Sequence, residues 1–463
     1  MNIEDFIRTK TYSALIRCLE QNQEQRREGI HVTDLVFPCV PAWQDIMTAD
    51  GIKPAEKIQV GDRVLTHRGR YRKVKRIFRR LYKGPLIGIK RWGVSREVTW
   101  LTPEHPILCA RKSDHTLNWV FAKDIDKSTF RPAYPRFCES ENVESFTLSV
   151  PSSRKSKFGK RLWTFFIPAT IPLMRIAGYY LAEGSLNKSN GTVKFSFGKS
   201  ETEKQYAEQV VKDAIQLGFT ARIYFDYYGW RVDISSRPLV QFLEQHFGSK
   251  AYGKYIDAKI KALPPYKLHY LFSAYMNGDG YARRMKTGKK YEAGSVSKRL
   301  IHDLRDIATK LGFAASVFTD HRDGLHTIQG RQVNQRPVFL LYCAKPSKFS
   351  RIKADSRYIY GSVDKIADMQ YDGFVFDFEV EEDRSYCTPS LTLHNCPRRA
   401  YFARKYADEP RLDWHSILRI WRGLKLHETR IFEEEEIELE WNGIIGRVDA
   451  YENGLVVDKK VTA

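Results

Sequence analysis

The stretch SLTLHNC, at residues 390–396, decides how this chain is organised. It ends a region of strand-like sequence with a histidine, an asparagine and a thiol in direct succession. A second thiol, Cys39, opens the same region in the stretch VFPCV (36–40). If these two ends meet in the fold, two thiols, an amide and an imidazole lie together. Such groups can carry out acyl transfer on the chain's own backbone.

The sequence between these ends predicts a β module that is split in two. From residue 43 to about 150, short apolar runs such as KIQVGDRVLT (57–66) alternate with polar residues and are broken by Gly, Pro and Asp. This pattern is typical of compact all-β structure. Strand-like sequence returns after about residue 350, as in GFVFDFEVE (373–381). A module of a different kind is therefore expected between the two halves.

The intervening sequence contains an internal repeat. IAGYYLAEG (176–184) recurs as FSAYMNGDG (272–280), and LGFTARIYF (217–225) recurs as LGFAASVFT (311–319), at offsets of 96 and 94 residues. Two nearly equal offsets predict a duplicated α/β unit with pseudo-two-fold symmetry. Small residues four apart in each predicted helix, Gly178 and Ala182 in one and Ala274 and Gly278 in the other, allow the two backbones to approach closely.

The junction residues suggest a sequence of acyl transfers. A thiolate at Cys39 can attack the carbonyl of Pro38, and Thr102 and His105 in TWLTPEHPIL (99–108) supply a hydroxyl and an imidazole to protonate the departing nitrogen.

Cys396 can then take the acyl group by thiol exchange. The side-chain amide of Asn395 can attack its own backbone carbonyl, with His394 as proton donor. A final sulfur-to-nitrogen shift would leave Pro38 joined to Cys396 by a peptide bond.

These residues resemble the Hint-fold inteins, and the resemblance covers residues 39–395. It rests on Cys39, the Thr102-x-x-His105 motif, FVFDFEVEEDRSY near the end and the His-Asn-Cys triplet. It implies autocatalytic protein splicing without a cofactor, and Asp377 matches the family's acidic position in the penultimate block. Arg384 stands where many members have a second histidine. Because the ring of Pro38 restricts the scissile carbonyl, the first step is expected to be slow.

The duplicated segments resemble the paired helices of LAGLIDADG homing endonucleases, with Glu183 and Asp279 at the positions of the catalytic acids. One carboxylate from each half implies Mg²⁺ binding and cleavage of both strands of a double-stranded DNA homing site. Lys261, in KALPPYK (261–267), matches the lysine that precedes the second helix. Two simpler interpretations remain: the acids merely end their helices, and Lys261 is an ordinary surface lysine.

The sequence left after removal of residues 39–395 reads HVTDLVFP followed by CPRRAYFARKYADEP, and it resembles CRISPR-associated exonucleases of the RecB-like, iron–sulfur type, a PD-(D/E)XK nuclease class. The matching nuclease motifs place His427, Asp449 and Asp458 as ligands of Mg²⁺ or Mn²⁺ and Lys460 as a catalytic residue. Taken singly, these would more often be surface residues.

The resemblance also implies partners and a cluster for the spliced host. DNA is the expected substrate, CRISPR adaptation proteins are possible partners, and Cys396 would be one ligand of a 4Fe–4S cluster. Three further cysteine ligands are expected near the carboxyl end of such enzymes, and they do not occur before Ala463. We therefore expect a fragment of the host.

These patterns together predict a multidomain protein: an all-β Hint domain split by a duplicated α/β LAGLIDADG endonuclease and flanked by α/β nuclease segments. The predicted boundaries are 1–38 for the first flank, 39–160 and 349–395 for the two parts of the Hint domain, 161–348 for the endonuclease and 396–463 for the second flank.

The composition is consistent with a nucleic-acid partner. The formal net charge is +21, from 76 Lys and Arg against 55 Asp and Glu, and such an excess attracts a polyanion. Seven scattered cysteines without CxxC spacing argue against a disulfide framework. No apolar run is long enough to span a bilayer, and the first residues, MNIEDFIRTK, do not read as a signal peptide. We expect a cytoplasmic protein with no membrane partner.

Two other functions fit part of the sequence. One is a Hint module that cleaves itself without ligating the flanks, although Asn395 and Cys396 would then be unnecessary. The other is a basic DNA-binding protein in which the splicing and endonuclease sites have decayed. The masses of the products formed by the whole chain distinguish these alternatives.

Overall fold

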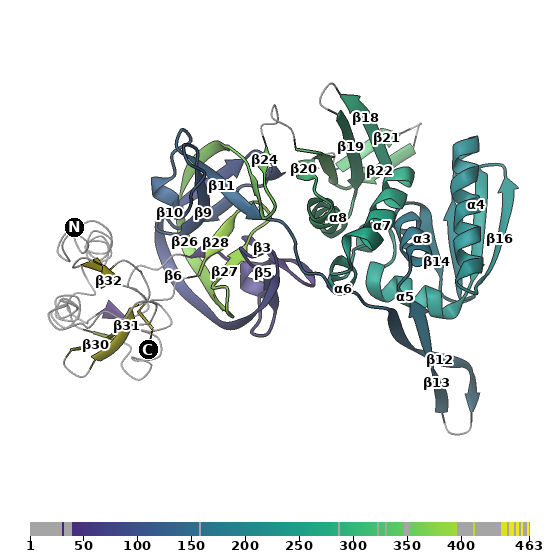
Figure 1. Cartoon of the computed structure of the whole chain (residues 1–463), viewed down its shortest axis with the longest axis horizontal. Coiled ribbons are helices and arrows are strands. Elements are labelled where there is room, and N and C mark those ends of the chain that lie inside the picture. The colour runs from purple at the N-terminus through teal and green to yellow at the C-terminus, as the bar shows by residue number, and fades with distance from the viewer. Residues whose placement is uncertain are drawn as a thin grey trace.

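The computed structural model describes residues 39–156, 159–285, 288–321, 324–328, 331–346 and 352–395, together with short strands in the two flanking segments. Two bodies lie side by side in Figure 1. The split β module consists of residues 39–135 and 352–395, and the inserted module consists of residues 145–346. The described residues are mostly strands, and the helices of the inserted module lie between the two stretches of the split β module.

The split β module is built from two sheets. Its strands before the insertion are β2 (Val40–Pro41), β3 (Asp45–Thr48), β4 (Gly51–Pro54), β5 (Arg63–Leu65), β6 (Tyr71–Arg91), β7 (Val94–Ser95), β8 (Thr99–Leu101), β9 (Pro106–Arg111), β10 (Leu117–Phe121) and β11 (Phe130–Pro135), with 3-10 helices η4 (Ala55–Lys57) and η5 (Ala122–Asp124). Its strands after the insertion are β24 (Lys353–Ala354), β25 (Tyr358–Tyr360), β26 (Val363–Val380), β27 (Ser385–Cys387) and β28 (Thr392–His394).

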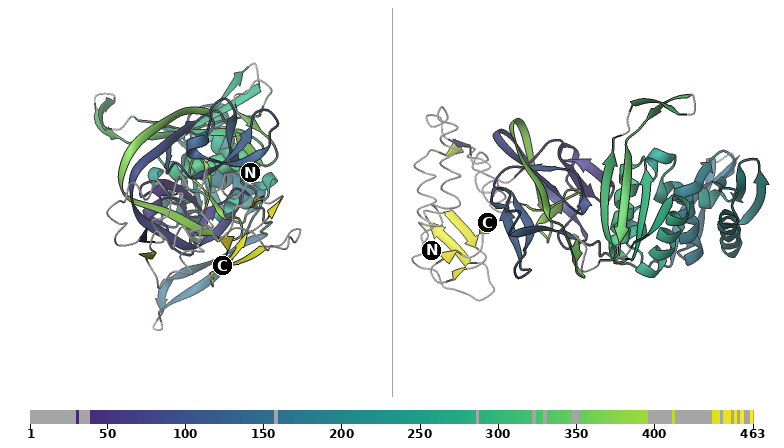
Figure 2. Two further views of the ribbon diagram at one scale, coloured as in Figure 1. Left: turned by 90° about the vertical axis from the view of Figure 1, so that its left-hand side faces the viewer. Right: turned by 90° about the horizontal axis from the view of Figure 1, so that it is seen from above.

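Each sheet combines strands from before the insertion with strands from after it. One sheet has the order β24-β25-β11-β9-β28-β27 with β10 beside β9, and the other has the order β2-β26-β6-β5-β3-β4 with β8 beside β6. The long strands β6 and β26 pair along most of their length and curve around one side of the module in the left view of Figure 2. Neither half can therefore complete a sheet without the other.

The inserted module is a duplicated unit, as the repeat predicts. It begins with the hairpin β12 (Ser145–Ser156) and β13 (Gly159–Pro168). The first half contains α3 (Ile171–Glu183), β14 (Gly184–Asn187), β15 (Thr192–Ser196), α4 (Glu201–Gln216), β16 (Thr220–Asp226), β17 (Gly229–Ser235), α5 (Arg237–Phe247) and η6 (Ala251–Gly253). The second half contains α6 (Ala258–Lys261), α7 (Pro265–Gly278), β18 (Gly280–Met285), β19 (Gly288–Ser295), α8 (Lys298–Lys310), β20 (Ala314–Asp320), β21 (Gly324–Ile328), β22 (Arg331–Gln335) and β23 (Val338–Ala344).

Serines start three of these helices. The hydroxyls of Ser200, Ser236 and Ser297 each accept a hydrogen bond from the backbone N–H three residues on, at 3.2 Å, and so cap α4, α5 and α8. Such a cap satisfies a donor that the first turn of a helix otherwise leaves unpaired.

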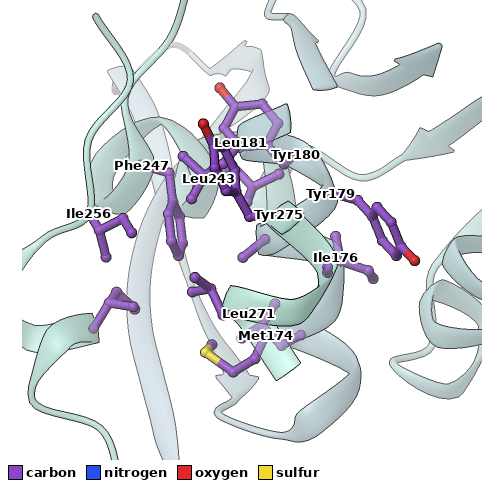
Figure 3. Packing of buried hydrophobic residues seen from close by; sticks show 14 of the residues in the cluster. Met174, Ile176, Tyr179, Tyr180, Leu181, Leu243, Phe247, Ile256, Leu271 and Tyr275 are labelled. Atoms are coloured by element: carbon purple, nitrogen blue, oxygen red, sulfur yellow. The ribbon is translucent and has the colours of Figure 1, made fainter. Parts of the chain in front are cut away.

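Helices α3 and α7 pack against each other at the centre of the inserted module, where Figure 3 shows their buried apolar side chains. A Cβ atom at Gly178 would lie 2.2 Å from the carbonyl oxygen of Leu271, and one at Gly278 would lie 2.5 Å from the Cβ of Ala182. Only glycine allows the backbones to come this close. The close approach predicted from the small residues is therefore confirmed.

The border between the two modules differs from the predicted one. Phe146, Leu148 and Val150 of β12 lie in the same apolar core as α3, so the hairpin packs with the inserted module. The boundary expected after residue 160 is corrected to a position before Ser145. The two modules also share a sheet, because β20 pairs in parallel with β7 through Ser316 opposite Val94.

The flanking segments contribute short strands. β1 (Ile30–His31) pairs with β29 (Arg411–Leu412), so a strand from before Cys39 lies beside one from after Asn395. The other described strands are β30 (Ile437–Trp441), β31 (Ile444–Val448), β32 (Tyr451–Glu452), β33 (Leu455–Val456) and β34 (Val461–Thr462). No helix in the described part of the chain is long and apolar enough to cross a membrane.

Candidate functional site

Cys39 is fully buried and its peptide group is held by Thr102. The Cys39 N–H donates to Thr102 Oγ1 at 2.9 Å, and the Thr102 N–H donates to the Cys39 carbonyl at 3.0 Å. Thr102 follows β8 directly and begins the turn that leads into β9. The hydroxyl predicted to serve the first residue thus lies against the backbone nitrogen of Cys39.

His105 lies at the end of the same turn and is fully buried. Burial lowers the pKa of its imidazole to about 3, although hydrogen bonding to the backbone of Cys39 and of His394 pulls the pKa upward. The imidazole is therefore neutral at physiological pH. Its Nδ1 has no hydrogen-bond partner among the residues that the structure describes. A buried ring nitrogen of this kind is available to a reacting group.

Asn395 follows β28 and is almost fully buried. Its N–H donates to the Arg384 carbonyl at 3.0 Å. With the side-chain amide oriented so that every donor faces an acceptor, Nδ2 donates to that same carbonyl and Oδ1 accepts from the Val380 N–H. Arg384 has a left-handed backbone conformation, with φ of +48°, that directs its carbonyl to Asn395. Arg384 therefore contributes a backbone oxygen that holds both nitrogens of Asn395.

His394 is directed at the carbonyl of the next residue. Its Nδ1 hydrogen-bonds the Asn395 oxygen, which belongs to the bond between Asn395 and Cys396. The edge of Trp119 packs on the imidazole, with ring centroids 4.7 Å apart. The expected proton donor thus contacts the oxygen on which charge would develop.

Two sheet registers bring the ends together. Val40, the residue after Cys39, pairs with Phe376, the residue before Asp377. Leu393 pairs with Ile107, and these two residues are each two positions from Asn395 and His105.

The Tyr386 hydroxyl lies between the Asp377 carboxylate and the His105 imidazole. It donates to Asp377 Oδ1 at 3.3 Å, and its hydroxyl is 3.5 Å from His105 Nε2. Sequence reasoning did not select Tyr386, because a tyrosine in a strand is more often a core residue.

Glu183 and Asp279 form a second cluster, at the ends of α3 and α7. The Glu183 carboxylate lies beside Gly278, the residue before Asp279, since a Cβ there would be 3.4 Å from Glu183 Oε1. Burial and the charge of Asp279 raise the pKa of Glu183 to about 7. Burial also raises the pKa of Asp279 to about 6. The two predicted acids are therefore brought together where two helix C-termini add further negative charge.

Lys254 is a member of this cluster that the sequence did not reveal. Its ammonium donates to the carbonyls of Tyr180 (2.8 Å), Leu181 (3.0 Å) and Gly184 (3.0 Å) at the end of α3. Burial lowers its pKa to about 8, while the charges of Asp279 and Glu183 oppose this shift. No repeat or motif marks Lys254; only the fold brings it to the helix end.

Lys261, which precedes α7, has its bonding partners outside the acid cluster. It is buried and donates to Asp303 at 2.7 Å, Asp306 at 3.2 Å and the Tyr71 hydroxyl at 2.8 Å. The simpler interpretation of an exposed surface lysine is wrong. Although burial disfavours the charge, these partners raise the pKa of Lys261 well above its usual value. It joins α6 and α8 to the split β module.

The acid cluster fits a hard divalent cation. Paired carboxylates with raised pKa values concentrate negative charge that a cation would neutralise, and oxygen ligands suit Mg²⁺. In the described part of the chain, no group of three or more His, Cys, Asp or Glu side chains is arranged as a metal site. The remaining ligands would have to come from phosphate groups and water.

The other predicted site residues lie outside the described residues. These are Cys396, His427, Asp449, Asp458 and Lys460, together with Pro38 at the first junction.

Comparisons with known proteins find several relatives, although no family model matches the chain. An uncharacterized protein of Methanocaldococcus jannaschii is 25% identical over 417 residues, which cover 77% of this chain and 50% of that protein. An iron-sulfur cluster assembly SufBD family protein of Mycobacterium tuberculosis is 26% identical over 390 residues, which cover 81% and 44%. The helicase Hel308 of Thermococcus kodakarensis is 23% identical over 416 residues, which cover 76% and 35%. The chain thus spans half or less of the length of these relatives.

Solved structures similar to parts of the chain include a homing endonuclease and an intein. I-DmoI in complex with DNA and Mn covers 38% of this chain and 90% of its own, with 13% identity and a TM-score of 0.26. The gp41-1 intein covers 29% of this chain and 88% of its own, with 15% identity and a TM-score of 0.15.

Proposed function

We propose that residues 39–395 excise themselves from the chain by protein splicing and that the inserted module cuts DNA. The observation that carries the first part is the convergence of the two junctions on His105. At the first junction, the Cys39 N–H donates to Thr102 Oγ1. At the second junction, the Asn395 carbonyl is hydrogen-bonded to His394 Nδ1. The backbone of both Cys39 and His394 lies close enough to the single imidazole to raise its pKa, against the larger effect of burial.

The first step would be attack of the Cys39 sulfur on the carbonyl carbon of Pro38. The carbon–nitrogen bond to Cys39 breaks, a thioester forms, and the thiol proton ends on the freed amine. Thr102 Oγ1 lies 2.9 Å from that nitrogen and can pass on the proton. His105, neutral because of its burial, can offer Nδ1 as a hydrogen-bonding group to the reacting atoms while the proton passes from the thiol to the amine.

After transfer of the acyl group to Cys396, Asn395 would release the excised element. Its Nδ2 attacks its own carbonyl carbon, the bond to the Cys396 nitrogen breaks, and a succinimide forms. His394 Nδ1 stabilises the carbonyl oxygen as negative charge develops. The Arg384 carbonyl accepts a hydrogen bond from Nδ2 and so orients it for attack, and the proton that Nδ2 loses ends on the Cys396 nitrogen, which leaves as an amine. The sulfur-to-nitrogen shift then gives a peptide bond between Pro38 and Cys396.

The relatives support an inserted element rather than a shared host. These relatives include proteins of different kinds, a SufBD family protein and a helicase among them. Residues 39–395 number 357, or 77% of the 463 in the chain, which is close to the shares that these relatives match. A segment common to proteins of different function is what a mobile insertion would produce.

For the inserted module we propose cleavage of double-stranded DNA at Glu183 and Asp279. When bound, Mg²⁺ would supply an activated water and stabilise the leaving oxygen. The two carboxylates would hold the ion, and Lys254 would fix the end of α3 from which Glu183 projects. The net charge of +21 favours association with DNA.

The host assignment rests on the flanking sequence motifs. We propose that joining residues 1–38 to 396–463 restores part of a CRISPR-associated RecB-like exonuclease that uses Mg²⁺ or Mn²⁺ and a 4Fe–4S cluster. The pairing of β1 with β29 supports one folded unit made from both flanks.

Intact masses of the purified full chain test splicing. We expect a 357-residue product and a ligated 106-residue product, with Cys39→Ala and Asn395→Ala abolishing ligation. Release of separate flanks without a ligated species would favour a self-cleaving module that does not ligate. An unchanged 53.9 kDa chain under all conditions would contradict the proposal. Binding of DNA without any cutting would favour the decayed DNA-binding protein.

A further inference from the structure

Helix α8 belongs to the inserted module, and its outer face packs against the split β module. Residues 300–309 are all buried, and charged side chains among them face the split β module. In Figure 1, α8 lies on the side of the inserted module that faces the β sheets. Charged groups are seldom fully buried unless they have specific partners.

Arg305 is the deepest of these charged groups and has no exposed surface. Its Nη1 donates to the Pro389 carbonyl at 2.8 Å, and its Nη2 donates to the Tyr134 hydroxyl at 3.0 Å. Asp306 neutralises the guanidinium at 2.9 Å. A planar guanidinium can satisfy several acceptors at once, which an ammonium cannot do with the same geometry.

Pro389 lies in a turn whose three successive carbonyls are each held by a different side chain. The Thr388 carbonyl accepts from Tyr134 at 3.2 Å, and the Ser390 carbonyl accepts from Arg91 Nη1 at 3.3 Å. Arg305 holds the middle one, at Pro389. The turn leads straight into β28, which ends at His394, immediately before Asn395.

We propose that Arg305 is a positioning residue for release at Asn395, so that the inserted module forms part of the splice site. This inference rests on the proposed splicing activity. Loss of the Arg305 contacts leaves a buried carbonyl unsatisfied and lets the turn relax, which shifts β28 and the Asn395 carbonyl relative to His105. A displacement of about 1 Å can slow a positioned reaction by roughly a hundredfold.

The effect is specific to one junction. Cys39 precedes β2, which pairs with β26 in the other sheet, and its peptide is held by Thr102. The turn at Pro389 reaches β8 through the Thr99 hydroxyl, which bonds Thr388 Oγ1 and Ser390 Oγ. Arg305 makes neither of these bonds, and the contacts at Cys39 are not made by the turn itself. Formation of the thioester at Cys39 should therefore be indifferent to Arg305.

The experiment uses the full chain with Arg305→Lys and Arg305→Met. The Asn395 step is followed in a Cys39→Ala background as release of residues 396–463. The Cys39 step is followed in an Asn395→Ala background as release of residues 1–38 by dithiothreitol. We expect the Asn395 step to slow by roughly ten- to a hundredfold and the Cys39 step to change less than about twofold.

Arg175→Met is the matched control. Arg175 makes a two-point ion pair with Asp213, at 2.6 and 2.8 Å, within the first half of the inserted module. It should leave both steps at the wild-type rate. Equal slowing of both steps by the Arg305 variants, or no slowing at all, would overturn the inference.

Hydrogen exchange separates this inference from the proposed function. If the wild-type chain reacts at neither junction, splicing is refuted. The claim that Arg305 holds the turn at Pro389, and with it residues 391–395, can still be tested. The amides of residues 391–395 should exchange faster in Arg305→Lys while those of β2 and β26 stay protected. Unchanged exchange in 391–395 would overturn the positioning role of Arg305.

Discussion

Helices α4 and α8 occupy equivalent places in the two halves of the inserted module, but only one of them faces solvent. The repeat Leu-Gly-Phe that follows each helix aligns them, with Leu217 matching Leu311. Inward-facing positions correspond and are buried in both, as for Val210 and Leu304. Outward-facing positions differ: Lys212 is exposed, whereas its counterpart Asp306 is buried.

This difference shows how a duplicated unit adapts to its host. The outer face of α8 carries His302, Asp303 and Arg305. The split β module binds Arg305 through the Tyr134 hydroxyl and the Pro389 carbonyl, while Asp303 accepts from Lys261. The matching positions on α4 are Glu208, which is exposed, and Gln209 and Val211, which are half-buried. The symmetry of the repeat is thus kept in the core and lost at the border, where one half has become an interface.

The largest expected effect comes from a feature that the two halves share. Each half supplies one acid, so Glu183→Gln and Asp279→Asn should each slow DNA cutting by on the order of a thousandfold or more. Supercoiled plasmid carrying the uninterrupted host gene, incubated with Mg²⁺, measures single-strand and double-strand cuts separately. If both variants still linearise the plasmid at the wild-type rate, the acid pair is not the DNA-cutting site.

A substitution at Lys261 tests how much the bonds at the border between the two modules contribute to stability. Lys261→Met removes one partner of a buried ion pair with Asp303 and should lower the free energy of unfolding by about 3–5 kcal/mol. The comparable change in the first half, Arg175→Met, breaks a pair that is partly exposed and should cost about 1–2 kcal/mol. Urea unfolding followed by tryptophan fluorescence measures both. Equal losses would mean that the border is no more tightly bonded than the solvent-facing half.

The sequence predicts what local patterns determine. Alternating apolar runs give the split β module, the repeat gives the duplicated unit, and small residues give the packing of α3 on α7. The motif spacing also selects Thr102, His105 and Asn395, which the registers of two sheets bring together. Each of these follows from periodicity or from a short motif on one element.

The sequence does not reveal contacts between distant elements. Lys261 matches a family lysine by its neighbours, but its partners come from α8 and from Tyr71, and no local pattern indicates them. From the sequence alone, the charged residues of α8 indicate a solvent-exposed face, because burial of that face depends on the position of the split β module. The pairing of the two-residue strand β7 with β20 has no sequence signal at all.

The pH dependence of stability should separate the acid cluster from the rest of the chain. The folded protein keeps protons on Glu183 and Asp279 up to pH values near their raised pKa of about 7 and about 6. The unfolded chain releases them near the ordinary values of about 4.3 and 3.9. The folded state therefore binds more protons in this window, and the acid pair costs less stability as the pH falls from about 7.5 to 5.

Glu183→Gln removes most of this dependence. We expect the variant to be more stable than the wild type by about 1 kcal/mol at pH 8, after allowance for solvent screening, and the difference to vanish near pH 4, below the pKa of the unfolded glutamate. Subtracting the two unfolding curves cancels the opposite effect of buried histidines such as His105, whose lowered pKa makes stability fall as the pH drops. A difference that stays constant with pH would contradict the raised pKa of Glu183.

The smallest effect is expected on the outer face of α4. Lys212→Gln keeps helix propensity nearly constant at an exposed position and should change the free energy of unfolding by less than about 0.5 kcal/mol. Its counterpart on α8, Asp306, accepts hydrogen bonds from both Lys261 and Arg305, so Asp306→Asn leaves two buried cations partly unpaired. A clear loss of stability in Lys212→Gln would mean that the outer face of α4 also packs on another surface. The two halves of the inserted module would then not differ in the exposure of this helix face.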